Sequence, residues 1–146
     1  MTTSNRTDSA DAGRSLDRAR QASITPAMVA ARVAELRPAM EAGDGAAMLA
    51  ALDQARAWWD AYPTEPAENG AEAMHLTHGW ADLMELVAHA PAASVPALLA
   101  KARLADWHWR ETGGDRSGWE GELARTLLAG LATLTGNGAR DMPARA

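Results

Sequence analysis

The sequence predicts an all-α protein, a compact antiparallel bundle of about five helices. Ala, Leu, Met, Glu and Arg dominate the chain, and these residues favour helix over strand. Residues branched at Cβ are few, and no run of alternating apolar and polar residues is long enough for a strand. Breaks rich in Gly or Pro separate segments that have the apolar spacing of amphipathic helices, joined by short connections.

The bundle domain is expected over residues 24–136. Residues 1–23 are polar and aperiodic, which predicts a disordered N-terminal arm, and residues 137–146 are expected to form a flexible C-terminal tail. The arm lacks the apolar run of a secretory signal, and no stretch approaches the ~20 apolar residues that cross a bilayer. The chain has no cysteine, which excludes disulfides and thiolate metal sites. We therefore expect a cytoplasmic protein without membrane contact.

The first helix is expected to begin at Thr25-Pro26, because Thr caps helices well and Pro suits the first turn. Pro38 lies inside the apolar pattern and is expected to kink the helix or to end it at Arg37. Four apolar residues at spacings of three and four make the buried stripe: Val29, Val33, Leu36 and Met40.

The second helix follows Asp44, a plausible cap between two glycines, and runs to about Ala61 before Pro63. Its expected buried face is Met48, Leu52, Ala55 and Trp59. The third helix is expected from Ala67 to Ala90, because Pro91 disfavours helical geometry in the residue before it. Its buried stripe is predicted as Leu76, Trp80, Leu83 and Val87.

The fourth helix is expected to be capped by Ser94 and to end at Gly113. Its predicted buried face is Leu98, Ala102, Ala105 and Trp109. The fifth helix has the clearest start signal, because Ser117 and Glu120 have the spacing of a capping box, and Gly136 is expected to end it. Its predicted stripe is Leu123, Leu127, Leu131 and Leu134.

Polar residues gather on one side of the third helix. At about 100° per residue, five of them fall within a sector of roughly 80° that lies nearly opposite the apolar stripe. They are His75, His78, Asp82, Glu85 and His89. Imidazole and carboxylate suit divalent metal ions, so one hypothesis is a metal site with His75, His78 and Asp82 as ligands. The alternatives are a solvated helix face and a partner-binding or pH-sensitive face that includes His78, Asp82 and Glu85.

The chain has six Trp, one Tyr and no Phe. Trp58 and Trp59 are adjacent, and Trp107 and Trp109 lie about 200° apart on a helix, so at least one of each pair should be partly exposed. We expect Trp58 and Trp107 either to bind a partner, which includes joining a homodimer, or to cover the edge of the bundle. Two others are expected inside the bundle, Trp80 and Trp119.

Charge limits the classes of partner. The chain has a net charge of −5, with most of the acidic excess in residues 25–136, which argues against direct contact with nucleic acid. An acidic body instead favours a partner protein with a basic surface. Lys101 and Arg103 form the densest basic spot and are expected to make surface pairs with Asp106 or Glu111. No phosphate-binding loop, GxSxG or HExxH motif is present.

The run HAPAASVPALLAKARLADWHW and the later run WEGELARTLLAGLATLTG carry a resemblance. Within residues 85–136 they resemble small uncharacterised all-helical proteins of bacterial chromosomes and prophages. Val95-Pro96 and the two Trp beside His108 depart from that pattern. The resemblance implies a phage or accessory-genome setting; it implies no activity and no site residues.

These observations predict a non-enzymatic, acidic, helical protein-binding module without a cofactor. Within that class, we consider a phage-type inhibitor whose acidic surface occupies the basic channel of a host nucleic-acid-handling defence complex. The alternatives are a metal-dependent enzyme or metal sensor, which would hold a divalent ion on the histidine face, and a structural homodimer.

Overall fold

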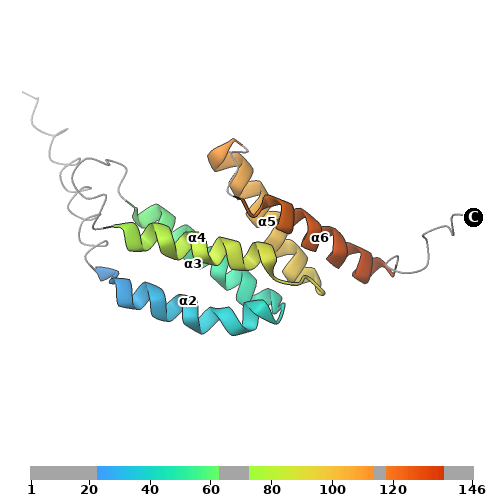
Figure 1. The fold of residues 1–146 in the computed structure, drawn as a ribbon, viewed down its shortest axis with the longest axis horizontal. Coiled ribbons are helices and arrows are strands. Elements are labelled where there is room, and N and C mark those ends of the chain that lie inside the picture. The colour runs from blue at the N-terminus through green and yellow to red at the C-terminus, as the bar shows by residue number, and fades with distance from the viewer. Residues whose placement is uncertain (1–22, 63–72, 114–117, 137–146) are drawn as a thin grey trace, which may run out of the picture.

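The computed structural model describes residues 23–62, 73–113 and 118–136, which form five α-helices and no strand. The helices are α2 (Pro26–Glu41), α3 (Gly45–Ala61), α4 (Met74–His89), α5 (Val95–Thr112) and α6 (Glu120–Thr135). They pack as one bundle, in which α4 is the central helix and contacts all four others (Figure 1). The all-α prediction is confirmed for this part of the chain. The expected arm, the expected tail and the predicted start of the third helix at Ala67 lie outside the described residues.

Helix α2 begins as predicted. The Thr25 hydroxyl accepts a hydrogen bond from Met28 N at 3.2 Å, and Pro26 occupies the first turn. The expected stripe of Val29, Val33, Leu36 and Met40 is buried. An end at Arg37 is wrong, because the helix continues through Pro38 to Glu41. Pro38 and Ala34 are both exposed, so water can bond the Ala34 carbonyl that loses its helical partner.

Helix α3 is capped by Asp44, whose carboxylate accepts hydrogen bonds from the backbone N–H groups of Ala46 and Ala47. Three of the four residues predicted for its buried face are buried, and the fourth, Trp59, is not. Trp58 is only 4% exposed, whereas Trp59 is partly exposed. The cause lies on α4, because a Cβ at Gly79 would come within 2.8 Å of the Trp58 ring. The missing side chain at Gly79 makes room for the Trp58 indole.

The predicted buried face of α5 is wrong. Ser94 caps the helix as expected, but the buried residues are Ala97, Ala100, Lys101, Leu104 and His108. Trp109, which was expected inside, is 68% exposed. The small Ala97 lies where the start of α5 meets Gly45 of α3. The two helices are so close that a Cβ added to Gly45 would clash with the Ala97 backbone. The buried face therefore combines small residues with two polar ones, a combination that the apolar spacing does not indicate.

Lys101 was expected on the surface, yet its side chain is completely buried. It is the only lysine of the chain. Its Nζ donates hydrogen bonds to the carbonyls of Val87 at 2.7 Å and Ala88 at 2.9 Å, in the last turn of α4. The Thr126 hydroxyl of α6 also donates to the Ala88 carbonyl, at 2.9 Å. These bonds satisfy carbonyls that have no partner within α4 and join three helices at one point.

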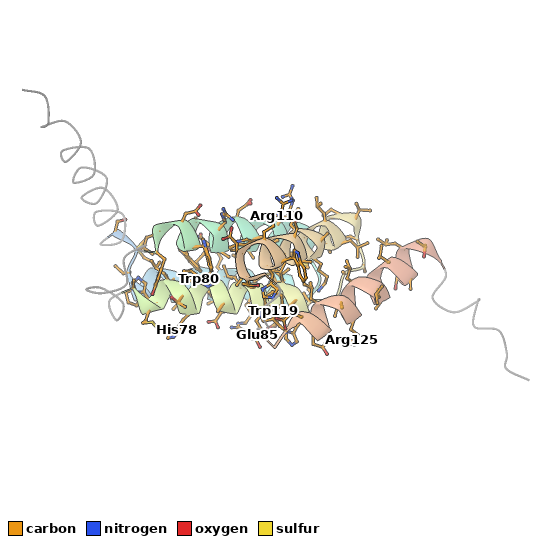
Figure 2. The ribbon with its side chains drawn as sticks, turned by 90° about the horizontal axis from the view of Figure 1, so that it is seen from above. His78, Trp80, Glu85, Arg110, Trp119 and Arg125 are labelled. Carbon is orange, nitrogen blue, oxygen red and sulfur yellow. The ribbon has the colours of Figure 1, made fainter. Side chains whose placement is uncertain are left out.

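Helix α6 begins at Glu120, with Trp119 at the N-cap. The capping box predicted from Ser117 and Glu120 stays a prediction. Ser117 itself lies outside the described residues, and the Glu120 carboxylate accepts a bond from Gly118 N. Only the first residue of the predicted leucine stripe lies in the core. Leu123 is buried and Leu127 is partly buried, whereas Leu131 and Leu134 are each 43% exposed. The C-terminal half of the helix extends beyond the ends of its neighbours (Figures 1 and 2).

A glycine allows α6 to pack closely where it passes the connection before α5. A Cβ added to Gly130 would clash with the Ala92 carbonyl oxygen and approach the Leu98 side chain. Gly136, with φ of 70°, ends the helix in the left-handed conformation, as predicted. No helix in the described parts of the chain combines the length and the apolar character that crossing a membrane requires.

We expect Gly130→Ala to lower the free energy of unfolding by about 1–3 kcal/mol, because the added methyl group meets backbone that cannot easily move. Gly121→Ala is the matched control in the same helix, since a Cβ there meets nothing within 4 Å. It should be neutral or should stabilise by up to about 1 kcal/mol. Urea unfolding followed by circular dichroism measures both. Equal effects at the two positions would contradict the close packing of α6 on residue 92.

Burial lowers the pKa of Lys101 from 10.5 to about 8, and the nearby charge of Arg125 acts in the same direction. Below pH 8 the folded and unfolded states are both protonated, and the cost of burying the charge is fully present. Between 8 and 10.5 the unfolded state binds the proton more tightly, so the free energy of unfolding should rise with pH. Urea unfolding across this interval should show the rise in the natural chain but not in Lys101→Met.

The single lysine also allows a direct measurement. With ¹³C only at lysine Cε, the protein should give one side-chain NMR signal that titrates near pH 8. A midpoint at or above 10.5, the ordinary value for lysine, would show that the two carbonyl bonds outweigh the cost of burial.

Candidate functional site

The polar face of α4 lies outward for the most part. His78, Asp82, Glu85 and His89 are exposed as predicted, and Figure 2 shows His78 and Glu85 on the outer side of the helix. His75 is partly buried, with its Nε2 2.7 Å from the Ile24 carbonyl oxygen. His89 Nδ1 lies 2.9 Å from the Glu85 carbonyl oxygen of its own helix. His75 and His89 therefore each have one ring nitrogen within hydrogen-bond distance of a backbone carbonyl oxygen.

A groove between α2 and α4 brings three of the predicted site residues together. It has a volume of about 330 Å³, and Val29, Val33 and Gly79 line it alongside polar groups. Those polar groups are His75, His78 and Asp82 of α4 and Arg37 of α2. Arg37 also pairs with Glu41 at 3.6 Å. The groove can accept a small apolar group and offers charges of both signs beside it.

The metal hypothesis gains no third ligand from this groove. Among the described residues, no group of three or more His, Cys, Asp or Glu could hold a metal ion. His78 and Asp82 lie one turn apart and could supply two ligands, whereas His75 makes the bond to Ile24. Metal binding stays a prediction.

The tryptophans form a cluster that joins α3, α4 and α5. The Trp59 ring lies 4.8 Å from Trp80 and 5.8 Å from Trp107 between ring centroids. The Arg56 guanidinium lies 5.5 Å from the centroid of Trp107, in cation–π geometry. Trp107 is only partly exposed and packs on α3, so it contributes to the bundle itself. Trp80, labelled in Figure 2, is buried as predicted.

In each of the two tryptophan pairs, the more buried member is the one that was expected at the edge of the bundle or in an interface. Trp58, proposed for partner binding, is a core residue, and Trp109, proposed for the core, is exposed. Trp119 is buried as expected and lies 4.6 Å from the ring of buried His108. His108 Nε2 is 3.1 Å from a carboxylate oxygen of Glu120. This group ties the end of α5 to the start of α6.

Among the described residues, six of the eight large apolar side chains that are exposed lie on α5 and α6. Five of these side chains define what we call the α5/α6 surface, and each is at least 43% exposed: Val95, Leu99, Leu128, Leu131 and Leu134. Val95 reaches 70% and Leu128 65%. Glu122 and Thr126 mark the flank of α6 that faces α4, because Thr126 bonds the Ala88 carbonyl. At about 100° per residue, Leu128 and Leu131 fall on the opposite flank, which is turned away from α4.

Helices α5 and α6 each contain a charged pair whose two members bond each other. Arg110 bonds Asp106 at 2.9 Å, and Arg125 bonds Glu122 at 2.7 Å. The bond from Arg125 holds the pKa of Glu122 below its ordinary value. From Thr126 to Gly136 the sequence has no charged residue. The α6 part of the surface therefore offers apolar contact without charge, whereas the α5 part is followed one turn later by the exposed Arg103.

Comparison with known proteins assigns no family to the chain. No protein-family model matches it, and no curated protein or solved structure matches it either. The resemblance to bacterial and prophage proteins stays a prediction. The candidate site is accordingly argued from its own contacts.

The buried face and the exposed face of α5 should contribute differently to the stability of the fold. We expect Leu104→Ala, in the completely buried face, to lower the free energy of unfolding by about 2–5 kcal/mol. Trp109→Gln, on the exposed face, should change it by no more than about 0.5 kcal/mol. Urea titrations compare the two variants with the natural chain. A large loss for Trp109→Gln and a small one for Leu104→Ala would restore the predicted orientation of α5.

Proposed function

We propose that this protein is a non-enzymatic helical bundle that acts by binding another protein chain through the α5/α6 surface. The observation that carries the proposal is the exposure of Val95 and Leu128, 70% and 65%, beside partly buried leucines on the same two helices. Contiguous exposed apolar patches on soluble domains commonly mark contact sites. Helical interfaces of this kind bind through apolar side chains spaced three and four residues apart.

The use of the titratable groups supports a binding function over a catalytic one. Lys101 has the lowered pKa of a potential nucleophile, but its amine is fully buried and bonded to two carbonyls. His108 is buried against Trp119 and Glu120. The groups with the most unusual surroundings thus hold helices together, and a substrate cannot reach the Lys101 amine in this arrangement.

The chemistry of the surface indicates what the partner provides. A partner with apolar side chains gains from this contact, because its own apolar area leaves water. The net charge of −5 still favours a partner with basic residues around that patch. A phage-type inhibitor that occupies the basic channel of a nucleic-acid-handling complex stays a hypothesis within this class. The salt dependence of binding separates a partner held by apolar contact from one held by ionic attraction. High salt screens ionic attraction and strengthens apolar contact.

The proposal is tested by photo-crosslinking in the cells that make the protein. Amine-directed crosslinkers would report poorly, because the single lysine is buried. A photoreactive phenylalanine derivative should instead replace Leu128 on the surface or, as a matched exposed control on α2, Met28. We expect a discrete protein adduct from position 128 and none from position 28. No adduct at 128, or the same adducts at both positions, would contradict the proposal.

A further inference from the structure

We infer that the groove between α2 and α4 is a binding site for a primary alkylammonium ion, which is a positively charged amine on an apolar chain. The groove lies apart from the residues of the α5/α6 surface, so the inference does not depend on the proposed function. Three features of the structure carry it: an apolar floor, a rim of hydrogen-bond acceptors on α4, and a carboxylate whose charge is left over in the groove.

The floor of the groove is apolar and closed. Helices α2 and α4 pack side by side (Figure 1). They approach closely at Gly79, where an added Cβ would lie 2.5 Å from Val29 Cγ1. Val33 also lines the floor and is buried, as Val29 is. The rim on α2 consists of small residues: Pro26, Ala30 and Ala34. The volume of about 330 Å³ is near the lower limit of small-ligand pockets, ~300 Å³, and suits a short alkyl chain.

The rim on α4 presents hydrogen-bond acceptors. His75 Nε2 lies 2.7 Å from the Ile24 carbonyl oxygen, and a carbonyl oxygen can only accept, so this nitrogen carries a proton. In the neutral His75 ring, Nδ1 is therefore an acceptor. His78 and Asp82 follow on the same rim, both exposed and one turn apart, where side chains on a helix are neighbours. An ammonium group has three donors and no acceptor, so it matches this rim.

The charge that is left over in the groove is negative. Arg37 also lines the groove, but its guanidinium lies 3.6 Å from the Glu41 carboxylate. Within the described part of the chain, the Asp82 carboxylate makes no ion pair or hydrogen bond. The net charge of −5 on the chain attracts cations in addition. A carboxylate ligand would have to compete with Glu41 for Arg37, and Asp82 would repel it.

A primary amine on an apolar chain has two natural sources, a free alkylamine and a lysine side chain of another protein. The only lysine of this chain is buried, so no lysine of a neighbouring copy can fill the groove. Hexylamine represents the first source. Nα-acetyl-lysine-N-methylamide, in which both backbone charges are blocked, represents the second.

NMR titration of the ¹⁵N-labelled full chain tests the inference. Hexylamine should shift the amide signals of α2 and α4 around the groove, with a dissociation constant on the order of 1 mM for so small a ligand. Hexanoate has the same chain length and the opposite charge, and it should bind at least about tenfold more weakly. Tighter binding of the blocked lysine than of hexylamine would assign the site to a lysine side chain, and weaker binding would assign it to a free amine.

Two pairs of variants locate the site. Asp82→Asn should weaken hexylamine binding at least about tenfold, because the amide lacks the charge that bonds the ammonium. Asp53→Asn makes the same change at an exposed position of α3 outside the groove and should leave binding unchanged. Ala30→Leu should also weaken binding, since the larger side chain occupies the groove. Ala31→Leu, at the next position and outside this groove, should not. Circular dichroism checks that each variant keeps its helices.

The inference is overturned when neither amine shifts the groove signals at concentrations well above the expected constant. Hexanoate binding as tightly as hexylamine, or Asp82→Asn binding hexylamine like the natural chain, would overturn it as well. None of these results bears on the proposed function, because photo-crosslinking at position 128 probes a different surface.

Discussion

The architecture depends on a buried ammonium group. The side chain of Lys101, the only lysine of the chain, lies inside the bundle, where an unpaired charge would be strongly unfavourable. The last turn of α4 compensates, because its carbonyls at Val87 and Ala88 have no helical partners and carry the negative end of the helix dipole. Thr126 shares the Ala88 carbonyl, so the same point also places α6. The geometry of three helices follows from this one set of bonds.

The sequence predicted the buried faces of α2 and α4 correctly because the large apolar residues of each stripe recur at spacings of three and four on one side of the helix. It failed on α5, where the helix carries two apolar faces of similar quality. Lys101 and His108 made the true buried face resemble a surface, while Leu98 and Trp109 resembled a core. What decides between the faces is the hydrogen bonding of Lys101 to α4 and the packing of His108 against Trp119 and Glu120 at the start of α6. Those partners are distant in the sequence, and residue spacing carries no information about them.

The candidate site was predictable to a similar extent. The outward direction of His78, Asp82 and Glu85 followed from their place opposite the apolar stripe. The choice between Trp58 and Trp59 did not, because adjacent tryptophans differ only in what they meet, and the space for Trp58 is made by Gly79 on another helix. The exposure of the C-terminal end of α6 could not be predicted from the sequence either. A leucine stripe has the same spacing whether or not a neighbouring helix is long enough to cover it.

Helix α5 thus buries Lys101 and His108 while it exposes Val95, Leu99 and Trp109, which is unusual for these residue types. The two observations have one cause. Rotating α5 to bury Val95 and Trp109 would carry Lys101 away from the two carbonyls and remove the bond that Val87 O accepts from it. The bonds made by a single amine therefore determine which apolar face is turned outward. In this protein the exposed apolar face of α5 is a direct consequence of how the core satisfies its polar groups.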